Sequence, residues 1–106
     1  MSIEEITRKI NETNMTFEEI TQKLNEIYIK KNKDYGNSFV KSCEEFGLVS
    51  PAIRMTDKLN RFKQLINSKP EVDESIKDTL LDLSNYAILT YKYITDSEEI
   101  CKELVL

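Results

Sequence analysis

The sequence contains no histidine and no tryptophan, and it has only two glycines, two prolines and two cysteines in 106 residues. The absence of histidine removes the most common general base and the most common ligand of transition metals. Hydrolysis by this chain would therefore depend on carboxylates and on a hard ion such as Mg²⁺. The scarcity of glycine and proline, beside many Glu, Lys, Leu and Ile residues, favours helices over sheets.

Long apolar runs are also missing, and the sequence predicts neither a membrane-spanning helix nor a secretory signal. Cys43 and Cys101 do not form a metal-type pair, so we expect reduced thiols in a cytoplasmic protein. With 40% hydrophobic and 32% charged residues, the composition is that of an ordinary folded domain rather than a disordered chain.

The net charge of −4 argues against DNA or RNA as partners, because they require a broad basic surface. Basic residues nevertheless gather in the middle of the chain, at Lys30, Lys31, Lys33, Lys41, Arg54, Lys58, Arg61 and Lys63. This concentration leaves room for a local anion-binding site on an acidic protein.

Several short patterns predict where helices begin. Ser2 with Glu5, and Thr16 with Glu19, have the spacing of capping boxes. We expect a break at the sequence DYGN, followed by a short helix from Ser38.

Two further signals divide the rest of the chain. Gly47 is expected to end the short helix, and the Ser50–Pro51 pair to begin the next one. A last short helix is expected from Ser97 onward. Helical spacing predicts two apolar faces turned toward a core, formed by Ile53, Leu59, Phe62 and Ile66, and by Ile76, Leu80, Leu83, Ala87, Tyr91 and Ile94.

These features predict a compact, all-α bundle of four to five helices in a single domain, 1–106. Residues 1–15 would form an N-terminal helix and linker, residues 16–95 the core bundle, and residues 96–106 a C-terminal tail helix. We also expect a homo-oligomer, because a domain this small has little room for a pocket and its last residues are apolar, at Ile100, Leu104, Val105 and Leu106.

Three polar segments are candidates for a binding site. The first could be a solvated turn, or an anion cradle of backbone amides with aromatic rings that stack on a base, and it comprises Lys31, Lys33, Asp34, Tyr35, Gly36 and Phe39. The second could be an ordinary charged helix face, with an aspartate bridging two arginines, or a phosphate clamp, and it comprises Arg54, Asp57, Lys58 and Arg61. The third could hold an arginine across the bundle, or Mg²⁺, and it comprises Asp78, Asp82, Asn85 and Tyr86.

The segments KNKDYGNSF, EEFGLVSPAIRMTDKLNR and ESIKDTLLDLSNYAILT occur in that order over roughly residues 17–93. Together they resemble the nucleotide modification associated domain of the first type, a small helical domain frequent in phages. The resemblance implies a nucleotide-related role in phage biology, in the cytoplasm of the host cell.

The layout is more distantly similar to the all-α, MazG-like nucleotide pyrophosphatases, which hold Mg²⁺ with paired acidic motifs on two helices. Here the first motif falls on RMTD, so that Arg54 takes the place of one carboxylate. An arginine attracts phosphate and repels Mg²⁺, which favours binding over metal-assisted hydrolysis.

Three functions follow as hypotheses. The first is a protein that binds a phosphorylated or cyclic nucleotide without turnover and without a cofactor, and that could sequester a host defence signal. The second is a Mg²⁺-dependent nucleotide pyrophosphatase or nucleotide-modifying enzyme, with Asp57, Asp78 and Asp82 as metal ligands. The third is a structural bundle that only contacts other proteins.

Overall fold

The protein is described by a computed structural model that covers the backbone of residues 1–35, 37–68 and 73–104. Side chains are described over the same ranges except at residues 10–13, 34–35, 73–75 and 103–104. The described chain forms five α-helices and no strand: α1 (Ile3–Thr13), α2 (Phe17–Tyr35), α3 (Ser38–Phe46), α4 (Val49–Asn67) and α5 (Asp73–Leu104). The prediction of an all-α fold with four to five helices is confirmed.

The first two helix starts are capped as the sequence predicts. The backbone N–H of Glu5 donates to Oγ of Ser2 over 3.1 Å. At α2 the bonds are reciprocal, because the Glu19 N–H donates to Oγ1 of Thr16 over 3.1 Å and the Thr16 N–H donates to Oε1 of Glu19 over 3.4 Å. Each bond satisfies a donor that a helix start would otherwise leave without an acceptor.

The boundaries of α3 and α4 differ slightly from the prediction. The chain leaves α3 through Gly47, which has a positive φ of 74° and donates its N–H to the Cys43 carbonyl over 2.8 Å, as a helix-ending glycine should. Helix α4 begins two residues before Pro51, at Val49. The proline is accommodated there because the first turn of a helix needs no N–H from it.

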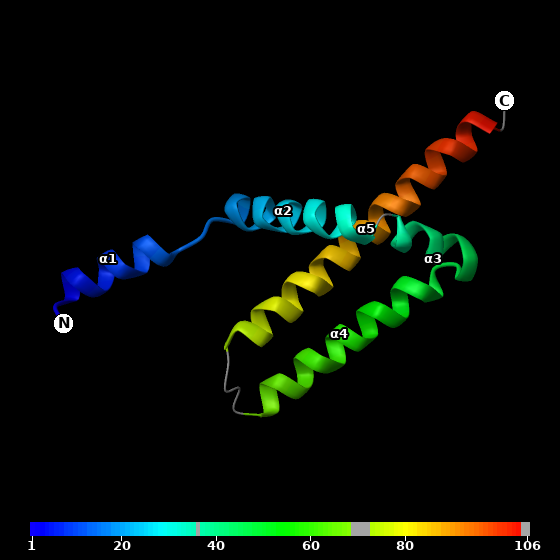
Figure 1. The fold of residues 1–106 in the computed structure, drawn as a ribbon. Helices are drawn as coiled ribbons and strands as arrows, with labels where there is room; N and C mark the ends of the chain where they lie inside the picture. The colour runs from blue at the N-terminus through cyan, green and yellow to red at the C-terminus, as the bar shows by residue number, and fades with distance from the viewer. Residues whose placement is uncertain (36, 69–72, 105–106) are drawn as a thin grey trace.

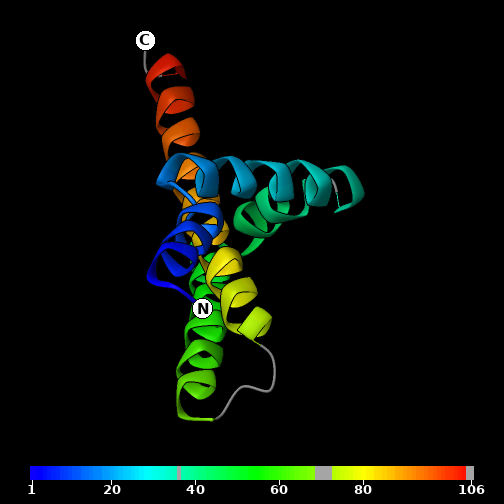
Figure 2. The same ribbon diagram turned by 90° about the vertical axis from the view of Figure 1, so that its left-hand side faces the viewer.

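The helices are arranged around a hairpin formed by α4 and α5, which run side by side in opposite directions (Figure 1) and make the most extensive packing in the chain. Helix α2 crosses α5, and α3 leads from the end of α2 to the start of α4. Helix α1 projects away from the hairpin (Figure 1), and the turned view shows α2 crossing α5 (Figure 2).

Helix α5 is a single helix of 32 residues, so the expected separate tail helix from Ser97 is wrong. No glycine or proline follows Pro70 to interrupt it. The side chain of Ser97 donates to the carbonyl of Tyr93 over 2.7 Å within the helix instead of capping a new one.

The chain is extended rather than compact. Its radius of gyration is 18.3 Å and its dimensions are 67 × 30 × 23 Å, whereas a compact domain of this length has a radius of gyration of about 13 Å. Few described side chains are fully buried, and they include Leu24, Cys43, Pro51 and Thr79.

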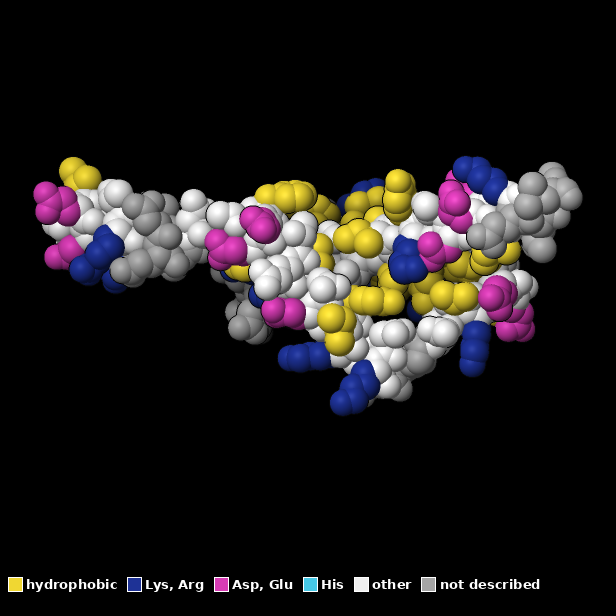
Figure 3. All heavy atoms as spheres, turned by 90° about the horizontal axis from the view of Figure 1, so that it is seen from above, with side chains coloured by type: hydrophobic (Ala, Val, Ile, Leu, Met, Phe, Trp, Pro, Cys, Tyr) yellow, Lys and Arg dark blue, Asp and Glu magenta, His cyan; other side chains and the backbone are white. Residues whose placement is uncertain are grey.

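The expected inward position of several apolar residues is therefore wrong for the single chain. Exposed side chains include Ile53, Leu59 and Ile66 on α4, and Leu80, Tyr91 and Ile94 on α5. Seen from above, hydrophobic side chains gather at the surface along the middle of the molecule (Figure 3). The physical reason is that a two-helix hairpin has two broad faces, and α2 and α3 approach only one of them.

No helix in the described part of the chain combines the length and the apolar content that crossing a membrane would require.

Candidate functional site

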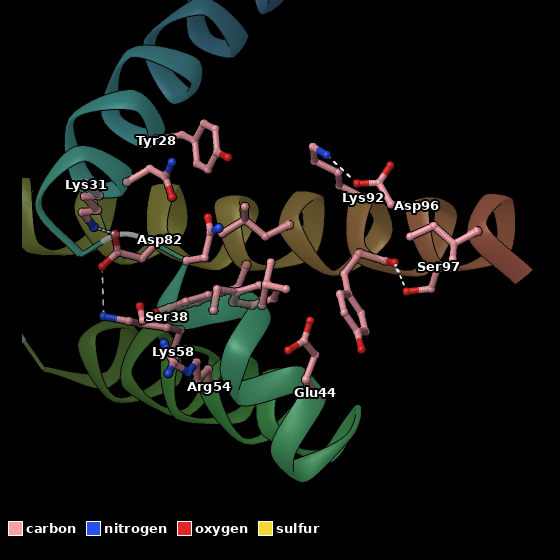
Figure 4. Close-up of a pocket in the computed structure, with 18 residues that line it drawn as sticks. Tyr28, Lys31, Ser38, Glu44, Arg54, Lys58, Asp82, Lys92, Asp96 and Ser97 are labelled. Atoms are coloured by element: carbon pink, nitrogen blue, oxygen red, sulfur yellow. Dashed lines mark hydrogen bonds and ion pairs between the residues drawn. The ribbon is translucent and has the colours of Figure 1, made fainter.

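A pocket of about 690 Å³ lies where α2, α3 and α4 meet α5 (Figure 4). This volume is typical of sites for small molecules and cofactors. All four helices contribute polar side chains, and α5 supplies one complete wall. That wall follows the helical repeat from Asp82 onward, through Tyr86, Leu89, Tyr93, Asp96, Ser97 and Ile100.

At one end of the pocket, Asp82 is held by two lysines. Its Oδ1 accepts from Nζ of Lys31 on α2 over 3.0 Å, and its Oδ2 accepts from Nζ of Lys58 on α4 over 2.9 Å. Burial alone would raise the pKa of Asp82, but the hydrogen bonds from Lys58 and Lys31 outweigh it, so the pKa lies below its usual value. The carboxylate is therefore ionised at neutral pH.

This pairing answers one question that the sequence leaves open. An arginine across the bundle was one alternative for Asp78 and Asp82, and Mg²⁺ was the other; among the described residues, two lysines pair with Asp82 and none with Asp78. The alternative in which Asp57 bridges Arg54 and Arg61 is not observed, because Asp57 forms no ion pair within the described part of the chain.

Beside this cluster, Tyr86 organises a second group. The guanidinium carbon of Arg54 lies 5.8 Å from the centre of the Tyr86 ring, within the range of a cation–π contact. The ring of Phe39 stacks with Tyr86, with centres 6.4 Å apart and planes inclined by 20°. Arg54 forms no ion pair with any described carboxylate, so no described acidic side chain accepts from its guanidinium N–H groups.

The other end of the pocket combines aromatic and charged side chains. Tyr28 of α2 lies across from the Lys92–Asp96 ion pair of α5 (Figure 4). The ion pair raises the pKa of Lys92 through the hydrogen bond to Asp96, so this ammonium group stays charged at neutral pH. Glu44 of α3 adds a third carboxylate to the lining, after Asp82 and Asp96.

Six of the predicted site residues line this one pocket: Lys31, Phe39, Arg54, Lys58, Asp82 and Tyr86. The structure thus brings the three predicted polar segments together. Five others do not line it, namely Lys33, Asp57, Arg61, Asp78 and Asn85. Helical spacing places Arg61 and Asp78 on the same helix sides as Arg54 and Asp82, but about one turn beyond the residues that line the pocket. Gly36 lies outside the described residues, and so do the side chains of Asp34 and Tyr35.

Sequence reasoning missed the outer part of the pocket, including Tyr28, Asn32, Asn37, Ser38, Glu44, Lys92, Tyr93, Asp96 and Ser97. A signal for the residues of α5 was present. Extending the helical repeat from Asp82 and Tyr86 by two more turns reaches Tyr93, and a third turn reaches Asp96 and Ser97.

The described acidic and thiol side chains do not gather into a group of three or more that could hold a metal ion. Asp82 faces two ammonium groups, and Asp57 and Asp78 lie outside the pocket, so the three carboxylates proposed as Mg²⁺ ligands do not converge. Burial raises the pKa of the Cys43 thiol despite the nearby Arg54, and only 2% of this residue is exposed. Cys43 is therefore a neutral, packed side chain rather than a nucleophile.

Together, the fold and the pocket define a small all-α protein with a mixed cationic and aromatic cavity. A family model described as nucleotide modification associated domain 1 matches residues 31–92. This match spans more than half of the 106-residue chain, so the protein belongs to this family. Comparison with curated proteins and with solved structures gave no match.

The matched range contains most of the pocket. It begins at Lys31, the α2 residue that holds Asp82, and it ends at Lys92 on the pocket wall of α5. The similarity to MazG-like pyrophosphatases stays a prediction.

Proposed function

We propose that this protein binds a phosphorylated or cyclic nucleotide in the pocket between α2, α3, α4 and α5, and that it releases the nucleotide unchanged. The observation that carries the proposal is the position of Arg54. Its guanidinium contacts the Tyr86 ring, has no carboxylate partner among the described residues, and lines the same pocket as Lys31 and Lys58. A planar guanidinium can bind two phosphate oxygens at once.

The two lysines can add to this phosphate site. Each ammonium group has three N–H donors and uses one of them on Asp82. The remaining donors are available to a phosphate, while Asp82 keeps both ammonium groups at the pocket wall.

Aromatic side chains further along the pocket suit the base. Phe39, Tyr28 and Tyr93 line it together with the apolar Leu89. Stacking of a base on an aromatic ring contributes about 1–3 kcal/mol per base in proteins that bind single-stranded nucleic acids, and it tolerates any base. A ligand with phosphate at the Arg54 end and base at the Tyr93 end would use both kinds of surface.

Binding without turnover is favoured by the way the carboxylates are used. Asp82 is engaged by two lysines and Asp96 by Lys92. The sequence contains no histidine, and no activated thiol lines the pocket among the described residues. Retention of an intact nucleotide is also what sequestration of a signalling nucleotide would require.

The test is recovery of the bound ligand. Purified protein would be dialysed against nucleoside mono-, di- and triphosphates and cyclic nucleotides, with and without Mg²⁺. It would then be heated to release what it holds, and the released material would be identified by mass spectrometry. Recovery of an intact nucleotide supports the proposal.

Other outcomes would reject it. Release of pyrophosphate or a monophosphate only with Mg²⁺ would identify a pyrophosphatase, and a chemically altered base or sugar would identify a modifying enzyme. Retention of nothing from the panel would leave a helical protein that contacts other proteins.

A further inference from the structure

The α4–α5 hairpin has a second face, opposite the pocket, that no other described helix of the chain covers. Successive residues of an α-helix are about 100° apart, which places Leu80, Ala87, Tyr91 and Ile94 roughly 120–180° around α5 from Asp82. By the same measure, Leu59 and Ile66 lie roughly 120–140° around α4 from Arg54. We name these six residues the back face.

The back face is apolar and exposed. Tyr91 is 74% exposed, Ile66 59%, and Leu59, Leu80 and Ile94 between 37% and 42%. These residues recur every three, four or seven positions, which is the spacing of a helix stripe that packs against other helices. The stripe thus has the pattern of a buried face, yet these residues stay exposed in the part of the single chain that the structure describes.

The accessible surface of the whole chain is also larger than that of a compact monomer. It exposes 8893 Å², whereas a compact monomer of 12.4 kDa exposes about 6,100 Å². The excess is about 2,800 Å² per chain. This excess is spread over the whole extended chain, α1 included, and it is comparable to the area of about 1,000–2,500 Å² that an obligate homodimer buries from each copy.

We infer that the back face is the interface with a second copy of this chain. Two hairpins packed back to back form a four-helix bundle, in which both stripes enter one shared core. The pocket of each copy stays on the outer side. A nucleotide cannot substitute for the second copy, because the back face extends along two helices on the side away from the pocket.

Analytical ultracentrifugation of the intact chain tests this inference. We expect twice the 12.4 kDa mass of one chain, or a larger multiple of it, at micromolar concentration. We also expect a melting temperature that rises with protein concentration, because association stabilises the folded state by mass action. A helical protein that sediments at 12.4 kDa would overturn the inference.

Substitutions locate the interface. Tyr91→Lys with Ile94→Lys places two charges on the back face, and we expect the mass to fall to that of one chain or the helix content to be lost. The matched control is Ile29→Lys, which changes an exposed apolar residue on the outer side of α2 and should keep the mass of the parent. A double variant that keeps the parent mass and melting temperature would show that the back face is not the interface.

Discussion

Oδ2 of Asp82 lies 2.9 Å from Nζ of Lys58, and this ion pair joins α5 to α4 at the edge of the pocket. The other oxygen of the same carboxylate holds Lys31, so α2 is fastened at the same point. One acidic side chain thereby connects three helices of a chain that has few buried residues.

The structural consequence is a defined dependence of stability on pH. We expect Asp82→Asn to lower the free energy of unfolding at pH 7 by about 0.5–1 kcal/mol, a modest loss because water screens a partly exposed pair. Pairing lowers the pKa of Asp82 in the folded state. The contribution of the ionised Asp82 to stability is therefore complete above the unfolded-state pKa of about 3.9. It is lost as the pH falls through that value toward the folded-state pKa.

Urea unfolding of parent and variant at pH 7, and again below about pH 3, measures this difference. The difference in the free energy of unfolding between the parent and Asp82→Asn should disappear below about pH 3. Asp78→Asn is the control, since it removes an exposed carboxylate one turn away that has no ion pair among the described residues. A gap that is equally large in acid would contradict a role for the ionised carboxylate.

The turn between α3 and α4 gives a second prediction. Gly47 has φ 74° and ψ −166°, a backbone region that essentially only glycine occupies. A Cβ at this position would meet no atom within 4 Å, so the cost of Gly47→Ala is backbone strain alone. We expect a loss of about 1–3 kcal/mol in the free energy of unfolding.

Thermal unfolding followed by circular dichroism measures this loss. Glu45→Ala, an exposed change in the preceding helix, should leave the melting temperature nearly unchanged. An equal melting temperature for Gly47→Ala and the parent would mean that the turn adopts another conformation.

Tyr86 gives a third prediction, because its ring supports both Arg54 and Phe39. We expect Tyr86→Leu to weaken nucleotide binding about fivefold or more, since it removes a cation–π contact and a stacked ring, each worth about 0.5 kcal/mol or more. Tyr86→Phe should bind nearly as well as the parent, because the ring remains. Calorimetric titration compares the three, and equal affinities for the parent and Tyr86→Leu would show that the ring does not shape the site.

The helices and much of the site could be predicted from the sequence because their signals are local. Ser2 and Thr16 cap the helices they were expected to cap, and Gly47 ends the helix that it was expected to end. Arg54 and Lys58 share a helix face by spacing alone. The three polar segments were also expected to form one site, because their order along the chain resembles that of a known family.

The partners of individual side chains could not be predicted, because they depend on how helices cross. Spacing cannot distinguish Lys58 from Arg61 as the partner of Asp82, since one helix turn separates them and only the crossing of α4 and α5 selects one. The sequence predicted which residues form the apolar faces, but it wrongly predicted that these faces are buried within the chain. A periodic stripe shows that a face is to be buried, and it does not show whether the same chain or a second copy buries it.

The most direct test of nucleotide binding at this pocket compares Arg54→Ala with Arg61→Ala. Both remove an arginine from α4, but only Arg54 lines the pocket. Calorimetric titration would use the nucleotide that the parent protein retains. We predict that Arg54→Ala weakens binding by tenfold or more, the equivalent of about 1.4 kcal/mol or more, that Arg54→Lys recovers part of the loss, and that Arg61→Ala binds like the parent. Equal affinities for Arg54→Ala and the parent, with both proteins folded, would contradict the account.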